Sequence, residues 1–227
     1  MFTIEKLDRL IASQLQAALP SAFIGRRIVV VEQTTSTNDA ILQMASPQGP
    51  PVSSLPAVAS AKEGPPSHSD EGLVLFAEHQ TAGRGQRGNR WESAAGDGLC
   101  FSILLRPQIQ INESFRLTVW AIEALSHVIR AEFSLESTIK MPNDIQLRGR
   151  KVAGVLVEMR AQQKAHHLAV VGIGVNANQS DFPNELQDKA TSLAMTLGRR
   201  VNRQEFAVAL LRQLDRTYRQ RFVKDAC

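Results

Sequence analysis

The sequence FAEHQTAGRGQRGNRW, residues 76–91, contains three glycines and three arginines and ends in a tryptophan. It continues an apolar run, Leu73–Phe76, whose composition is typical of a β-strand. Glycine lets backbone N–H groups approach a ligand closely, and arginine offers a planar set of donors for phosphate or carboxylate. The stretch therefore predicts an anion-binding loop at the end of a strand. A solvated basic loop without a ligand is the alternative.

Gly83, Gly85 and Gly88 also match G-x-G-x-x-G, the fingerprint of dinucleotide-binding folds. Such a fold requires a helix that opens inside the motif and an acidic residue about 20 positions further on. The chain continues instead through Trp91 into AAGDG, residues 94–98, which has no helical periodicity. We therefore do not expect a dinucleotide-binding fold.

The composition is that of an ordinary globular protein: 227 residues, 43% hydrophobic and 21% charged, with a net charge of +4. Local anion sites account for the excess positive charge, so we expect no nucleic-acid partner. The two cysteines form no C-x-x-C motif, and the five histidines lack metal-ligand spacing. No apolar run has the length of a membrane span, and no signal-type segment opens the chain. These features predict a cytoplasmic protein without a membrane partner.

Hydrophobic periodicity predicts helices separated by β-branched runs that are typical of strands. The predicted helices cover residues 3–19, capped by Thr3, part of 34–45, residues 112–133, capped by Asn112, a short helix from Thr191 or Ser192 to Gly198, and residues 204–222. The predicted strands cover residues 26–32, 73–78, 99–106, 138–141, 145–147, 151–159 and 169–176. The core-facing stripe of the 112–133 helix is predicted to be Phe115, Val119, Ile122, Ile129 and Phe133.

Residues 46–72 differ in composition from the rest of the chain. They contain six prolines, three glycines and six serines, and no large aromatic residue. Such a segment cannot bury enough apolar area to offset the entropy lost on ordering. We predict a partly disordered surface insertion within one domain, because strands of one sheet are expected on both sides of it.

Two further polar patches are candidates for a site. Ser36, Thr37 and Asn38 precede a short helix, and because an N-cap needs only one such residue, the surplus suggests groups that serve a ligand. Lys151 begins an apolar strand beside Gly154, where an ammonium group is costly to desolvate. A lysine in such a place often neutralises phosphate or a developing oxyanion. The alternative is a lysine that extends into solvent from the strand end.

Asn143 and Asp144 form either a simple turn or a site in which Asp144 holds a magnesium ion that bridges a nucleotide. Gly172 and Gly174 alternate in the 169–176 strand and leave one of its faces without side chains. No Ser–His–acid order and no nucleophilic cysteine context occurs, which disfavours covalent catalysis. Phosphate-binding arginines, a buried Lys151, a candidate magnesium carboxylate and strands flattened by glycine together suggest a site that activates a carboxylate with a nucleotide.

Four segments resemble, in the same order, those of biotin protein ligases of the biotin/lipoate ligase family: TTSTNDA (34–40), AEHQTAGRGQRGNRW (77–91), KMPNDIQLRGRKVAGVLVE (140–158) and VVGIGVN (170–176). The resemblance covers roughly residue 28 to the end of the chain. It implies an α/β fold of the α+β type, with a mixed, largely antiparallel sheet and helices mainly on one face, like class II aminoacyl-tRNA synthetase and biotin ligase catalytic domains. It allows a homodimer through a sheet edge.

The resemblance implies a ligase that uses ATP and Mg²⁺ to attach biotin to a biotin carboxyl carrier protein. The biotin carboxylate would attack the α-phosphorus of ATP, giving biotinyl-5′-AMP and pyrophosphate. A lysine of the carrier domain, of the acetyl-CoA carboxylase type, would then attack the acyl carbon and release AMP. The alternatives are a lipoate or octanoyl ligase or transferase on the same fold, and a non-catalytic biotin-binding relative.

The resemblance also assigns residues, motif by motif. The implied biotin-binding residues are Ser36, Thr37, Asn38, Gln80, Gly83, Arg84, Gly85, Lys151 and Gly154. The implied nucleotide-binding residues are Arg84, Arg87, Trp91, Asn143, Lys151 and Asn176. Lys151 and Arg84 are the implied catalytic residues: the lysine would contact the biotin carboxylate and the α-phosphate, and the arginine belongs to the loop that folds over them. Asp144 would support magnesium.

The sequence departs from the family pattern at three positions near the expected site. Gln86 and Asn89 stand where many relatives have arginine, and Met141 stands where many have tryptophan. These changes imply a weaker hold on the adenylate, which Arg87 or Arg90 would compensate, and a softer biotin pocket wall. The expected domain organisation is a single catalytic domain over 1–227. The N-terminal DNA-binding domain and the small C-terminal β-barrel of many relatives are expected to be absent.

Overall fold

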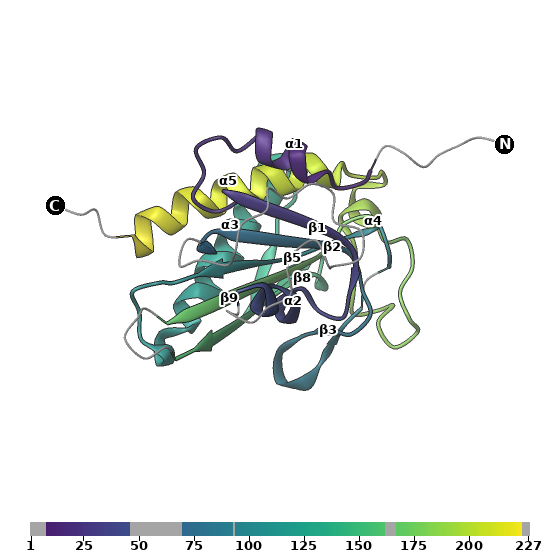
Figure 1. The fold of residues 1–227 in the computed structure, drawn as a ribbon. Coiled ribbons are helices and arrows are strands. Elements are labelled where there is room, and N and C mark those ends of the chain that lie inside the picture. Colours follow the sequence, from purple (N-terminus) through teal and green to yellow (C-terminus); the bar gives the residue numbers. More distant parts are fainter. Residues whose placement is uncertain (1–7, 46–69, 93, 162–166, 224–227) are drawn as a thin grey trace.

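The computed structural model describes residues 8–45, 70–92, 94–161 and 167–223. A seven-stranded sheet forms its centre, with the strand order β1-β2-β5-β9-β8-β7-β6 (Figure 1). The strands are β1 (Arg27–Thr34), β2 (Leu73–Gln80), β5 (Gly98–Leu105), β6 (Thr138–Lys140), β7 (Asp144–Leu147), β8 (Arg150–Arg160) and β9 (Leu168–Asn176). The β1–β2 pair is parallel and the other neighbouring pairs are antiparallel. The predicted mixed, largely antiparallel sheet is confirmed.

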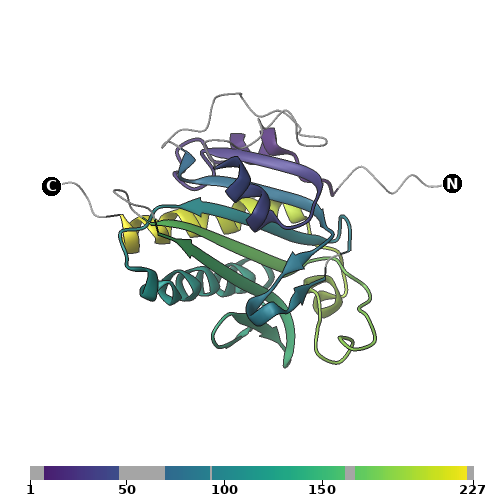
Figure 2. The same cartoon turned by 60° about the horizontal axis from the view of Figure 1, so that its bottom comes forward.

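The helices cover the two faces of this sheet unequally. The helices are α1 (Ala12–Ala17), α2 (Thr37–Met44), α3 (Phe115–Phe133), α4 (Leu193–Leu197) and α5 (Arg203–Phe222). Those labelled α1, α3 and α5 contribute to one large core, whereas α2 covers a smaller core on the opposite face (Figure 2). The prediction of helices mainly on one face is confirmed. Within the described ranges, no helix is long and apolar enough to cross a bilayer.

The β-branched run of β1 is explained by burial on both faces of the sheet. Ile28 and Val30 belong to the large core, and Val29 and Val31 belong to the smaller core under α2. Successive side chains of a strand point to opposite faces, so a strand covered on both sides must be apolar at every position. This is why the run could be recognised as a strand from the sequence.

The first helix is much shorter than predicted. α1 covers Ala12–Ala17, whereas residues 3–19 were expected to be helical, and the predicted cap at residue 3 lies outside the described residues. The N–H of Leu10 donates to Glu78 Oε1 at 2.9 Å, and that of Ile11 donates to Gln204 Oε1 at 3.0 Å. These tertiary bonds satisfy the backbone donors and hold residues 8–11 outside the helix.

The start and the buried face of the α3 helix also differ from the prediction. Asn112 is not its cap: Gln110 and Glu113 form a capping box around a single 3₁₀ turn, and α3 begins only at Phe115. Phe115 itself is 62% exposed, so its placement in the core stripe was wrong. The buried residues of this helix are Leu117, Thr118, Trp120, Ala121, Ile122, Ala124, Leu125, Val128 and Ile129.

Most of the predicted insertion, residues 46–69, lies outside the described residues, so the insertion stays a prediction. Its last three residues, 70–72, were wrongly included. Asp70 is buried and pairs with Arg27 at 3.1 Å, and the N–H of Gly72 donates to the carbonyl of Leu104 at 2.8 Å. These bonds make the segment the entry into β2 rather than part of a loose loop.

One edge of the sheet is open within the described residues. Residues 150–154 of β8 pair with β7. The pairing of β8 with β9 begins at Ala153 and runs to Arg160. From Leu156 to Arg160, β9 is the one strand that pairs with β8 in the described ranges. A homodimer through a sheet edge would need such a segment, and it stays a prediction.

Candidate functional site

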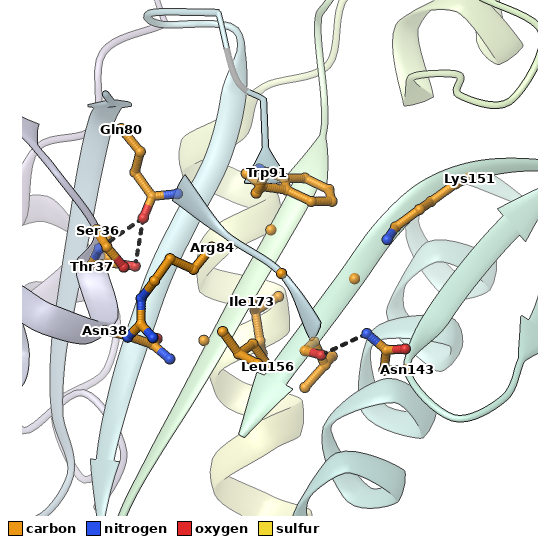
Figure 3. Close-up of a pocket in the computed structure, with 15 residues that line it drawn as sticks. Ser36, Thr37, Asn38, Gln80, Arg84, Trp91, Asn143, Lys151, Leu156 and Ile173 are labelled. Atoms are coloured by element: carbon orange, nitrogen blue, oxygen red, sulfur yellow. Dashed lines mark hydrogen bonds between the residues drawn. The ribbon is translucent and has the colours of Figure 1, made fainter. Parts of the chain in front are cut away.

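A cavity, partly open to solvent, lies where α2, β2, β8 and β9 meet beneath a small hairpin of β3 (Gly83–Arg84) and β4 (Arg90–Trp91) (Figure 3). Its polar lining is Ser36, Thr37, Asn38, Gln80, Arg84, Trp91, Asn143 and Lys151. Its other lining residues are Val155, Leu156, Ile173 and the glycines Gly85, Gly154, Gly172 and Gly174. The fold therefore brings the three polar patches of the sequence into one site.

Glycines in β9 make room for side chains that cross the floor of the cavity. A Cβ atom at Gly172 would lie 2.3 Å from Asn38 Oδ1, and one at Gly174 would lie 2.5 Å from Cε2 of Trp91. Both distances are shorter than any normal contact. The strand face that was predicted to lack side chains exists, and it receives the amide of Asn38 and the indole of Trp91.

Replacing Gly174 with alanine is expected to displace the indole of Trp91 and to open the hairpin above the cavity. Overpacking of this kind costs about 1–3 kcal/mol. The chain has two tryptophans, and Trp120 is 1% exposed while Trp91 is half-buried. A red shift of the tryptophan emission of the variant would therefore report Trp91. An emission spectrum identical to that of the wild type would contradict the packing of Trp91 on β9.

Polar groups of α2 and β2 line one end of the cavity. Gln80 Oε1 accepts a hydrogen bond from the N–H of Thr37 at 2.8 Å and another from its hydroxyl at 3.2 Å. Ser36 is the N-cap residue of α2, yet its side chain makes no capping hydrogen bond. The surplus of cap-type residues therefore places a hydroxyl group at the cavity wall, where Figure 3 shows Ser36 beside Thr37.

Two polar residues behind this wall were missed by the sequence reasoning. Ser102 is fully buried in β5, and its hydroxyl lies 2.6 Å from Asn38 Oδ1 and 2.7 Å from Thr37 Oγ1. Glu158 in β8 accepts a hydrogen bond from Asn38 Nδ2 at 2.7 Å. The available signal was a polar residue inside an apolar strand, because a buried polar group is almost always hydrogen-bonded to a partner.

The glycine- and arginine-rich stretch is an ordered hairpin rather than a loop. Gly83 pairs with Trp91, and Arg84 pairs with Arg90. A Cβ atom at Gly83 would lie 2.5 Å from the carbonyl oxygen of Trp91, so the close pairing of the two short strands requires glycine. Gly83 was predicted to bind the ligand, but it does not line the cavity and instead allows the hairpin to close.

Arg84 joins the hairpin to the walls of the cavity. Its Nη1 donates to Glu158 Oε1 at 3.0 Å, and its Nη2 donates to Glu158 Oε2 and to Asp39 Oδ1, each at 2.7 Å. The hydrogen bonds to Glu158, assisted by the negative charges of both carboxylates, raise the pKa of Arg84. The predicted ligand arginine therefore lies at the cavity, but two carboxylates compensate its charge.

Lys151 lies at the other end of the cavity. Its Nζ is 2.8 Å from Asp144 Oδ1 and 5.5 Å from the ring centre of Trp91. A Cβ atom at Gly154 would lie 3.2 Å from this Nζ, so the glycine leaves room for the lysine. The side chain of Lys151 is 34% exposed, and the expectation of a buried lysine was therefore wrong. It is a partly exposed cation held by a carboxylate and an aromatic face.

A second, larger depression adjoins the cavity, and Trp91 and Lys151 line both. The charged residues that line this depression are Arg90, Glu92, Lys140, Asp144, Lys151, Asp188 and Lys189. Groups bound in the two spaces would meet at Lys151. The cavity has a lining of mixed polarity, the second depression has a charged lining, and Lys151 belongs to both. Such an arrangement suits the joining of two ligands, one of which is an anion.

The remaining residues predicted to bind the nucleotide do not all line the cavity or the second depression. Asn143 lines the cavity, and its Nδ2 donates to a backbone carbonyl of β8 at 3.0 Å. Asn176 lines the second depression, but it is buried: it donates to the carbonyl of Thr191 at 3.1 Å and accepts from Gln179 at 3.2 Å. Arg87 is exposed at the tip of the hairpin, with φ of 56°, and lines neither space. The predicted nucleotide contact of Arg87 therefore has no support in the geometry.

Asp144 is the residue that was predicted to support magnesium. In the described part of the chain, no group of three or more His, Cys, Asp or Glu side chains converges on one point. Mg²⁺ bound with a nucleotide needs only one or two protein carboxylates, because the phosphates supply further oxygens. The Oδ1 atom of Asp144 is buried against Lys151, at the second depression. The donor set therefore fits a magnesium ion that arrives with a nucleotide.

The mixed, largely antiparallel sheet is that of a catalytic domain of the class II aminoacyl-tRNA synthetase and biotin ligase type. The structure of biotin protein ligase from Aquifex aeolicus in complex with biotin and ATP is similar, with a TM-score of 0.65 and 26% sequence identity. The match covers 88% of this chain and 75% of that chain. The profile of the Biotin/lipoate A/B protein ligase family matches residues 56–176. The chain belongs to that family.

Two curated relatives bear on the role of the chain. The bifunctional ligase/repressor BirA of Bacillus spizizenii is 31% identical over 218 residues, which are 95% of this chain and 61% of the relative. The biotin--[acetyl-CoA-carboxylase] ligase of Mycobacterium tuberculosis is 32% identical over 195 residues, 84% of this chain and 63% of the relative. The chain thus spans just over three-fifths of the length of these relatives.

Proposed function

We propose that this chain activates biotin with ATP as biotinyl-5′-AMP and transfers the biotinyl group to a lysine of a biotin carboxyl carrier domain. One observation carries the proposal: Lys151 lies where the smaller cavity adjoins the charged second depression. The names of the relatives, and the biotin and ATP in the related Aquifex structure, support this choice of acid and nucleotide. We also propose a cytoplasmic location, because the reaction would draw on ATP.

Biotin would occupy the smaller cavity with its ureido ring near the polar end. There, Ser36, Thr37 and Gln80 offer hydroxyl and amide groups to the ring. Leu156 and Ile173 supply the apolar surface for the thiophane ring and the chain. The polar groups and Lys151 lie on opposite sides of the cavity (Figure 3), so the carboxylate of a ligand in this orientation would reach the lysine.

ATP would occupy the second depression, with its phosphates toward Lys151. The indole of Trp91 lines both chambers and would separate the two ligands from solvent. Asp144, beside Lys151, would hold a magnesium ion that neutralises phosphate charge when it is bound. With its carboxylate engaged in this way, Asp144 would leave the ammonium of Lys151 to the ligand.

The chemistry requires positioning and charge neutralisation rather than a covalent enzyme intermediate. A carboxylate oxygen of biotin forms a bond to the α-phosphorus, and the bond to the leaving pyrophosphate breaks. The ammonium of Lys151 neutralises part of the negative charge of the biotin carboxylate and the α-phosphate, which this reaction brings together. The amine of the carrier lysine then attacks the acyl carbon, loses a proton, and displaces AMP. The closed hairpin, held by Arg84, would exclude water from the mixed anhydride between the two steps.

The proposal is tested by measuring which acid supports pyrophosphate release from ATP and Mg²⁺ by the purified chain. Biotin is expected to support release, and lipoate and octanoate are not. Release with lipoate or octanoate in preference to biotin would overturn the choice of acid and assign the chain to another branch of the same family.

A further inference from the structure

Arg84 forms the tightest polar link between the hairpin and the rest of the site. Both oxygens of Glu158 accept from its guanidinium, at 3.0 and 2.7 Å, in a two-pronged arrangement. Asp39, in the first turn of α2, accepts from the same guanidinium at 2.7 Å. Paired, charge-assisted hydrogen bonds of this kind are stronger and more directional than single neutral ones. The link connects the roof of the cavity to two of its walls.

Glu158 also determines the orientation of Asn38. One of its oxygens, Oε2, accepts from Asn38 Nδ2 at 2.7 Å, while Asn38 Oδ1 accepts from Ser102 at 2.6 Å. Asn38 is 3% exposed and packs over Gly172, which has no side chain to push it away. The two ends of the amide are therefore distinguished by a carboxylate on one side and a hydroxyl on the other.

We propose that Glu158 is a positioning residue of the site: its carboxylate holds the hairpin closed through Arg84 and fixes the amide of Asn38. The second part of its role, retention of the bound adenylate, rests on the proposed function. In this arrangement Arg84 acts mainly as a latch, and the phosphate charge is left to Lys151. A competing arrangement, in which Arg84 leaves Glu158 to bind the ligand, predicts slower rather than faster release of the adenylate when Glu158 loses its charge.

The experiment compares the full-length wild type with Glu158→Gln by hydrogen exchange in the absence of ligand. The glutamine keeps the size of the side chain but removes its charge and one acceptor from the fork. Amides of residues 83–91 are expected to exchange about tenfold faster in the variant, and amides of α3 and α5 at unchanged rates. Glu136→Gln is the matched control, because Glu136 pairs with Arg130 at 2.7 Å on the exposed surface, away from the hairpin. Unchanged exchange at 83–91 would overturn the latch.

A second measurement follows dissociation of preformed biotinyl-5′-AMP from each protein. Glu158→Gln is expected to release it faster, and Glu158→Asp, which keeps the charge, to recover part of the difference. Slower release from Glu158→Gln would favour the competing arrangement and overturn the proposal. If Glu158→Gln fails to fold, Asp39→Asn removes the charge that strengthens the single bond from Arg84 to residue 39 and should raise exchange and release in the same direction. The exchange experiment needs no ligand, so it tests the latch even if the proposed function fails.

Discussion

Replacing Lys151 with alanine is expected to slow the formation of biotinyl-5′-AMP by about 100- to 1,000-fold, the usual effect of removing a donor that stabilises a reacting anion. Lys151 lines both the cavity and the second depression. Its ammonium pairs with one carboxylate, that of Asp144, at 2.8 Å, whereas Arg84 pairs with two. The affinity for biotin should fall much less, because the ureido end of the ligand is bound elsewhere. Single-turnover measurement of the adenylate, beside calorimetry of biotin binding, separates the two effects.

The control for this prediction is Arg130→Ala, which removes a cation from a surface pair with Glu136. The rate of adenylate formation should be unchanged in that variant. If Lys151→Ala forms the adenylate at the rate of the wild type, the lysine has no role in the reaction. In that case the position of Lys151 between the cavity and the second depression would not explain the formation of the adenylate.

The largest expected effect on stability comes from Arg203→Ala, with a loss of about 3–5 kcal/mol in the free energy of unfolding. Arg203 is 1% exposed, and its Nη1 donates to Glu78 Oε2 at 2.8 Å and to the carbonyl of Gly98 at 2.9 Å. The alanine would leave Glu78, which is 8% exposed, as a buried charge without its partner. Denaturant unfolding of the two proteins measures the difference.

A matched surface pair and a double variant control for the loss of any arginine. Arg130→Ala should reduce the free energy of unfolding by no more than about 1 kcal/mol, because exposed pairs contribute little. Arg203→Met combined with Glu78→Gln should recover part of the stability lost in Arg203→Ala, since no unpaired charge then remains. Equal losses in Arg130→Ala and Arg203→Ala would show that burial of the Arg203–Glu78 pair has no special cost.

The central strands of the sheet could be predicted because they are buried on both faces. Residues 28–31 of β1 are all β-branched, which leaves little choice between strand and helix. The helix boundaries at 12 and 115 could not be predicted, because they depend on tertiary bonds and on a local capping box. Leu10 is held by Glu78, 68 positions away, and no local pattern contains that information.

The members of the site were predictable from motifs, but their partners were not. Lys151 and Arg84 were singled out as cations for a ligand, and each lies at the cavity. That Asp144 holds the lysine, and that Asp39 and Glu158 hold the arginine, follows from the approach of separate strands and helices. Ser102 and Glu158 were missed because a single polar residue in an apolar strand resembles a solvent-facing position until its neighbours are known.

The proposed activation of biotin by this chain is best measured as pyrophosphate release from ATP and Mg²⁺, with biotin, lipoate or octanoate as the only acid. Joined chambers that meet at Lys151, with a hydrogen-bonding end for a ureido ring, predict release with biotin and a protein-bound biotinyl-5′-AMP in equal amount. Biotin binding without pyrophosphate release would contradict the proposed formation of biotinyl-5′-AMP. The chain would then be a biotin-binding protein without the activating reaction.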